Sequence, residues 1–114
     1  MDVALTLRVA RGQQAQQGEI DAWLQKGDHA RNGAVVAEGA FFELKVPDGV
    51  ALERLAAGCV CCIGLVPMQV TLTRLLRQRR PHALLLLISD ASHLDRLRTL
   101  VEGGKLGVRL EESA

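Results

Sequence analysis

Aromatic residues are scarce in this chain of 114 residues, which contains one tryptophan, two phenylalanines and no tyrosine. Because proteins that bind single-stranded nucleic acid stack the bases on aromatic side chains, this scarcity argues against that mode of recognition. Neither sign of charge dominates, since fourteen basic residues stand against thirteen acidic ones. A net charge of +1 gives no long-range attraction to nucleic acid or to an anionic membrane. We therefore expect neither as a partner.

Long apolar runs are also missing. The longest one covers 83–88, whereas about 20 apolar residues are needed to cross a bilayer. The N-terminal sequence MDVALTLRVARG does not place charged residues before an apolar stretch, so we expect no secretory signal. The three cysteines are clustered rather than dispersed as in a secreted disulfide framework. We therefore predict a cytoplasmic protein whose thiols are reduced and available to metals.

The length and the 48% hydrophobic content suit one globular domain over 1–114. Apolar periodicity predicts strands at 3–9, 34–37, 40–46, 83–88 and 107–111. It predicts helices at 19–26 and 67–80, and a third that opens at 89–92 and ends at Gly103-Gly104. The stretch 50–57 fits either a strand or a helix. This alternation indicates a three-layer α/β fold with a mostly parallel sheet.

Several segments between these elements look like connections. The Gly- and Gln-rich stretch 10–18 is interpreted as a loop, 27–33 as a polar turn and 47–49 as a turn. The run 83–88 has no polar alternation, which is typical of a strand covered on both faces. The arginines of 74–80 are interpreted as a solvated helix end, where cations complement the helix dipole.

The cysteines carry the most pointed chemical signal in the chain. Cys59, Cys61 and Cys62 occupy four consecutive positions behind Gly58. Their thiolates can converge on one ion if the backbone turns tightly, and a glycine permits such a turn. Soft sulfur ligands favour Zn(II) or Cu(I), and tetrahedral zinc requires one further ligand. The alternative is that the cysteines are small buried hydrophobic residues without a ligand.

Asp90, His93 and His29 are the candidates for a fourth ligand within the chain, and water, a second molecule or a client protein could also supply it. Asp90 and His93 follow the buried strand, at the edge where open α/β sheets bind ligands. The simpler interpretation makes Ser89 or Asp90 a helix N-cap and His93 a surface residue.

The segment Gly58-Cys59-Val60-Cys61-Cys62 resembles the GCxCC signature of the CobW-type metal-chaperone GTPases. The similarity extends to the order of elements that follows it: a Leu-rich charged helix, a break at Pro81 and the apolar strand 83–88. Upstream, 34–39 is similar to the second strand of that family. The resemblance implies a P-loop-NTPase-like fold and metal binding through the cysteines.

The departures from that family concern its GTPase parts. The resemblance places the phosphate-binding loop, G-x-x-x-x-G-K-[ST], at 10–18, and this stretch contains no lysine, serine or threonine. The Glu-Thr-Thr-Gly element is replaced by 89–92. Since the phosphate cradle and the magnesium ligand are both missing, we expect a degenerate P-loop, no catalytic residues, no GTP hydrolysis and no nucleotide.

The preferred hypothesis is a non-catalytic, CobW-like metal-binding protein that stores or transfers zinc through its CxCC cysteines. Its partners would be the metal ion and, in a transfer role, a client metalloprotein. Two alternatives remain: a thiol redox protein in which Cys61 pairs with Cys59 or Cys62, and an interaction domain with silent cysteines. Residual nucleotide binding is a weaker fourth option.

Overall fold

The computed structural model describes residues 3–26, 29–39, 43–55, 66–89, 91–104 and 107–113. The strands are β1 (Val3–Val9), β2 (Gly33–Glu38), β3 (Ala51–Leu55), β4 (Ala83–Ile88) and β5 (Val108–Ser113). The helices are α1 (Gln13–Leu24), α2 (His29–Asn32), α4 (Val66–Arg79) and α5 (Leu94–Glu102), and a 3-10 turn, η1 (Ala91–His93), precedes α5. The ambiguous stretch 50–57 thus forms a strand over 51–55.

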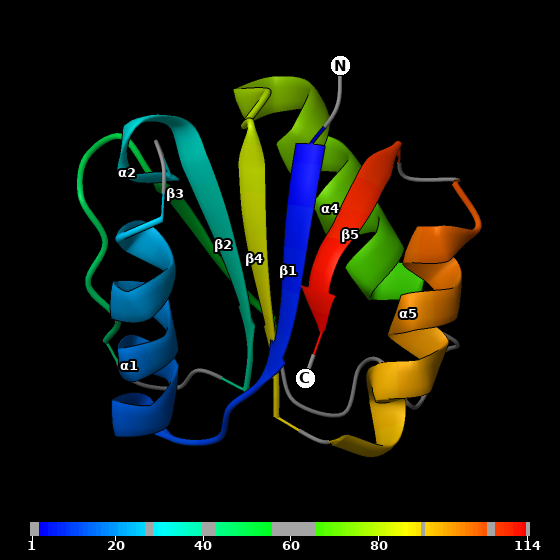
Figure 1. The fold of residues 1–114 in the computed structure, drawn as a ribbon, viewed down its shortest axis with the longest axis horizontal. Coiled ribbons are helices and arrows are strands. Elements are labelled where there is room, and N and C mark those ends of the chain that lie inside the picture. Colours follow the sequence, from blue (N-terminus) through cyan, green and yellow to red (C-terminus); the bar gives the residue numbers. More distant parts are fainter. Residues whose placement is uncertain are drawn as a thin grey trace.

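The strands build one sheet in the order β3-β2-β4-β1-β5, and each neighbouring pair is parallel. Helices α1 and α2 lie against one face of this sheet, while α4 and α5 lie against the other (Figure 1). The prediction of a three-layer α/β fold with a mostly parallel sheet, of the P-loop-like kind, is confirmed. No helix in the described ranges is long and apolar enough to cross a membrane.

Strand β4 lies at the centre of the sheet, between β2 and β1. All six of its residues are buried, as the uninterrupted apolar run predicts. Its side chains alternate between two cores. Leu84, Leu86 and Ile88 pack with Leu72 and Leu75 of α4 and Leu97 and Val101 of α5. Ala83, Leu85 and Leu87 pack on the other face with Ile20 and Trp23 of α1. A strand between two such layers needs apolar side chains in both directions.

Helix α1 begins earlier than the sequence pattern predicts. The stretch 13–18 was expected to be a loop, but it forms the first half of this helix. Its buried positions are Gln16, Ile20 and Trp23, which recur at the spacing of one helical face. The prediction failed because a polar residue occupies the first buried position, which hid the periodicity. Glutamine and alanine are also good helix formers, so the local sequence does not oppose the helix.

The predicted strand at 40–46 is wrong over 43–46, which is irregular in the structure, and 40–42 lie outside the described residues. These residues bond to side chains of α1 rather than to another strand. The side-chain amide of Gln17 donates to the carbonyl oxygen of Lys45 (3.0 Å) and accepts from its N–H (2.8 Å). Gln13 donates to the carbonyl oxygen of Glu43 (3.1 Å). The glutamines of α1 thus hold this segment beside the helix.

Candidate functional site

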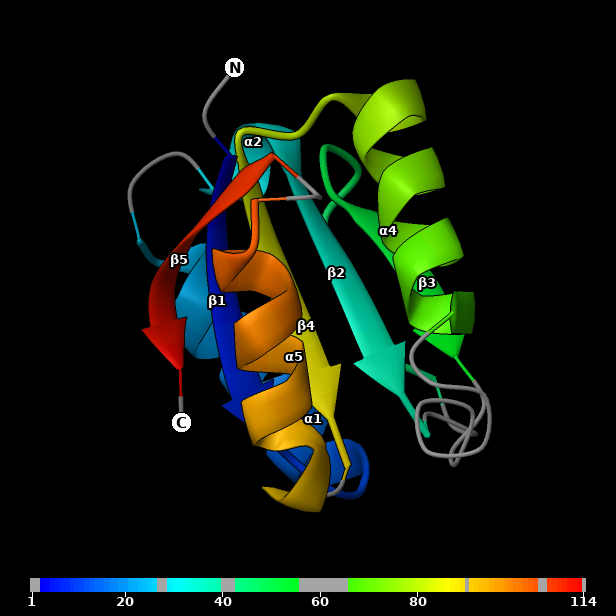
Figure 2. The same ribbon diagram turned by 90° about the vertical axis from the view of Figure 1, so that its right-hand side faces the viewer.

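The cysteine segment connects β3 to α4, and Cys59, Cys61 and Cys62 lie outside the described residues. Its two flanks are described. Strand β3 ends at Leu55, and helix α4 begins at Val66. Figure 2 shows that α4 starts beside the carboxyl end of the sheet and runs back along the strands. The connection therefore leaves and returns at the edge where parallel α/β sheets bind ligands.

The structure describes only some of the residues that were predicted as the fourth zinc ligand. Asp90 and the side chain of His93 lie outside the described residues. Ser89, which directly precedes Asp90, stands at the carboxyl end of β4. Within the described ranges, no group of three or more His, Cys, Asp or Glu side chains is placed to hold a metal ion.

His29 is not suited to be the fourth ligand. Its ring stacks on Trp23 with 4.6 Å between the ring centroids, and its Nδ1 lies 2.9 Å from the carbonyl oxygen of Trp23. His82, which precedes β4, lies 6.2 Å from the same ring. His29 thus sits at the amino edge of the sheet. A strand of six residues spans about 20 Å, so the sheet separates His29 from the carboxyl edge where the cysteine segment is anchored.

At the carboxyl edge, the neighbouring strands β1 and β4 form the switch point of the sheet. The connection after β1 leads to α1 on one face, and the connection after β4 leads to α5 on the other (Figures 1 and 2). Such a switch point is the usual ligand site of an open α/β sheet. Here β1 and α1 are joined by only three residues, Ala10, Arg11 and Gly12. Gly12 has a φ of +91°, a conformation that favours glycine.

A phosphate-binding loop needs a longer excursion than this connection provides. In such a loop, free backbone N–H groups point at the phosphates. In this chain the corresponding residues are already helical, and the N–H of Gln16 donates to the carbonyl oxygen of Gly12 (3.0 Å). Because α1 starts early, the N–H of Gln16 is bonded within the helix. In a phosphate cradle such a backbone donor would be free to bind phosphate.

Gln16 lies at this carboxyl edge with a buried side chain. It belongs to the stretch 10–18, where the resemblance places the phosphate loop and its lysine. Its side chain is 1% exposed. The Nε2 atom donates to the carbonyl oxygens of Ala10 (3.1 Å) and Glu38 (3.0 Å). A neutral amide thus ties the ends of β1 and β2 together at this position.

Glu38 is a buried acidic residue at a position that the sequence pattern assigns to the connection between the predicted strands 34–37 and 40–46. It is fully buried at the end of β2, and its Oε1 accepts hydrogen bonds from the N–H and the hydroxyl of Ser89, both at 3.0 Å. Its Oε2 and the Oε1 of Gln16 are buried without a hydrogen-bond partner among the described residues. The available signal was a glutamate that directly ends an apolar strand. These bonds fix the end of β4 against the end of β2.

Comparison with known proteins supports the resemblance drawn from the cysteine motif. Neither a protein-family model nor a solved structure matches the chain. Over 61 residues, which are 54% of this chain, the sequence is 39% identical to the zinc chaperone YeiR of Escherichia coli strain K12. The matched residues make up 18% of that protein's length. This partial similarity supports the resemblance to the CobW-type metal chaperones at the level of the family.

Proposed function

We propose that this chain is a non-catalytic, CobW-like α/β domain that holds zinc through Cys59, Cys61 and Cys62 and passes it to a client protein. The observation that carries the proposal is the cluster of three thiols in four positions. Three thiolates form a soft donor set of the kind that binds zinc. The partial identity with a zinc chaperone points to the same metal.

The flanking structure supports a site at the carboxyl edge. The connection that contains the cysteines is bounded by the end of β3 and the start of α4. Asp90 directly follows Ser89 at the end of β4, and His93 closes the 3-10 turn that follows. We therefore retain Asp90 and His93 as the proposed fourth ligands. A site with three protein ligands and one exchangeable position would suit the transfer of zinc better than its permanent storage.

We include no nucleotide in this proposal. The support is the short β1–α1 connection and the Gln16 amide, which donates to two backbone carbonyl oxygens within the region where the resemblance places the phosphate loop. A thermal-shift measurement with GTP and Mg²⁺ should leave the unfolding temperature unchanged. A shift that saturates with GTP would contradict this part of the proposal.

Zinc titration of the reduced protein against a chromogenic chelator tests the proposal. We expect one zinc per chain, and we expect Cys61→Ser to abolish stoichiometric binding. The matched control is His29→Gln, which alters a zinc-binding residue type at the opposite edge of the sheet and should keep the stoichiometry. No binding at micromolar zinc, or full binding by a variant with serine at all three cysteine positions, would refute the proposal.

A further inference from the structure

One long stretch of this chain contains no acidic residue. None of the thirteen acidic residues lies between Glu53 and Asp90, although the same stretch contains five arginines. The rest of the chain contains nine basic and thirteen acidic residues. The near-zero net charge thus conceals a segregation of charge along the sequence. The positive stretch includes the three cysteines and all of α4.

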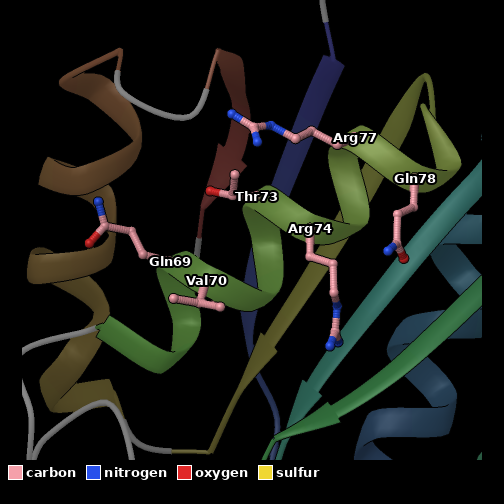
Figure 3. Close-up of a pocket in the computed structure, with 6 residues that line it drawn as sticks. All are labelled: Gln69, Val70, Thr73, Arg74, Arg77 and Gln78. Atoms are coloured by element: carbon pink, nitrogen blue, oxygen red, sulfur yellow. The ribbon is translucent and has the colours of Figure 1, made fainter.

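Helix α4 turns this stretch into a surface. Its buried side, with Leu72 and Leu75, packs on the sheet. Its outward side borders a hollow of about 500 Å³. The lining residues form two rows at four-residue spacing along the helix (Figure 3): Gln69, Thr73 and Arg77 in one row, and Val70, Arg74 and Gln78 in the other. Ten residues of helix give this surface, which we call the α4 face, a length of roughly 15 Å.

The α4 face combines one apolar contact with several hydrogen-bond donors. Val70 is 60% exposed. Among the residues that the structure describes, no other large hydrophobic side chain is exposed. The guanidinium groups of Arg74 and Arg77 lie further along the same helix. Arg74 bonds to Glu53 at 3.3 Å, but both side chains are exposed (51% and 37%), and exposed ion pairs of this kind contribute little. A carboxylate from a partner could therefore replace Glu53 at small cost.

We propose that the α4 face is a docking surface for an acidic segment of a partner protein. Carboxylates of that segment would bind Arg74 and Arg77, and one of its apolar side chains would cover Val70. An acidic protein segment fits better than nucleic acid, because two arginines give few phosphate contacts. The acidic excess in the rest of the chain would also repel a polyanion that extends past the helix.

The position of α4 connects this surface to the cysteines. Cys62 precedes the first residue of α4, Val66, by four positions, which an extended chain covers in about 14 Å at most. A partner docked along α4 would thus bind within this chain length of Cys62, one of the proposed zinc ligands. Identifying this partner as the zinc client rests on the proposed function, whereas the acidic chemistry of the docking segment does not.

Fluorescence anisotropy with a labelled acidic peptide tests the docking surface. The probe is a helical peptide of about twelve residues, which spans roughly 18 Å, with glutamate and leucine on one face. Its counterpart has glutamine in place of every glutamate. We expect the 114-residue chain to bind the acidic peptide more tightly than its counterpart, and we expect added salt to weaken that binding.

Single charge reversals locate the binding. Arg77→Glu should weaken the binding of the acidic peptide about tenfold, because it replaces an attraction by a repulsion at the surface. Arg31→Glu reverses an arginine on α2 that is also exposed and should change the affinity less than about twofold. Circular dichroism of each variant checks that it remains folded. Equal affinity for the two peptides, or equal loss in the two variants, would overturn the proposal, as would tighter binding of a single-stranded oligonucleotide of the same charge.

The two proposals can fail separately. A variant with serine at Cys59, Cys61 and Cys62 should lose zinc and still bind the acidic peptide. If zinc binds as expected but the peptide does not, the docking surface is refuted and the zinc function stands. If the peptide binds but zinc does not, the reverse holds, and the α4 face serves a partner other than a zinc client.

Discussion

The buried amide of Gln16 gives the sharpest test of the fold at the carboxyl edge. In Gln16→Ala, the carbonyl oxygens of Ala10 and Glu38 both lose their side-chain donor in a buried place. A buried polar group left unsatisfied costs about 1–3 kcal/mol. Alanine regains about 0.3 kcal/mol through its higher helix propensity, and removal of the buried, unpartnered Oε1 of Gln16 offsets a further part of the loss from the two carbonyl oxygens. We therefore expect the free energy of unfolding to fall by about 3 kcal/mol.

This loss is large enough to measure in two ways. With an unfolding entropy near 2.1 cal/mol/K per residue, 3 kcal/mol corresponds to a decrease of roughly 12 °C in the melting temperature. At an m-value of about 2 kcal/mol/M, the urea midpoint would fall by about 1.5 M. Trp23 is the single tryptophan, lies on the same helix and is 2% exposed, so its fluorescence reports the unfolding of α1 directly.

Two companion variants separate hydrogen bonding from bulk. Gln14→Ala makes the same chemical change at an exposed position of α1 and should alter stability by less than about 0.5 kcal/mol. Gln16→Met keeps most of the side-chain volume but has no donor, so it should lose nearly as much stability as the alanine variant. If Gln16→Ala costs less than about 1 kcal/mol, or if methionine restores stability, the argument from the two carbonyl oxygens is refuted.

Two other pairs of variants test the packing on the two faces of the sheet. A methyl group at Gly33 would overlap the carbonyl oxygen of His29 and lie 2.5 Å from the ring of Trp23, so Gly33→Ala should destabilise the protein by about 1–3 kcal/mol in urea unfolding. Gly18 lies within α1 with no atom near such a methyl group, and Gly18→Ala should instead stabilise by about 0.8 kcal/mol. Equal effects at the two glycines would contradict the described position of Trp23. On the other face, Leu86 is fully buried in the core under α4 and α5, and Leu86→Ala should cost about 2–5 kcal/mol in the same assay. Val70→Ala removes an exposed side chain from α4 and should cost less than about 0.5 kcal/mol, and a larger loss would show that Val70 is a packing residue rather than a free surface.

The elements that the sequence predicted correctly are those whose pattern of apolar and polar side chains fits only one kind of secondary structure and burial. The run 83–88 is apolar at every position, and a short strand buried on both faces is the structure that uses such a run. The apolar stripe behind Pro67 likewise marked α4 to within one residue at each end. The same local signals indicated the parallel α/β class, because strands and helices alternate along the chain.

The errors arose where a side chain takes its role from distant backbone. Gln16 looks like a loop residue until the sheet brings the carbonyl oxygens of Ala10 and Glu38 to its amide. The segment 43–46 alternates like a strand, but its hydrogen-bond partners are glutamine side chains on α1. A residue pattern records polarity and spacing, and it does not record which backbone groups lie opposite.

The sequence by itself determined the chemistry available to this protein: three clustered thiols, no phosphate-loop lysine and a stretch without acidic residues. Tertiary structure decided where that chemistry lies. The parallel sheet anchors both ends of the cysteine segment at its carboxyl edge and leaves His29 at the other edge. Packing of α4 on the sheet turns its arginines outward. Such placements depend on contacts between segments far apart in the chain, and for this reason local pattern could not supply them.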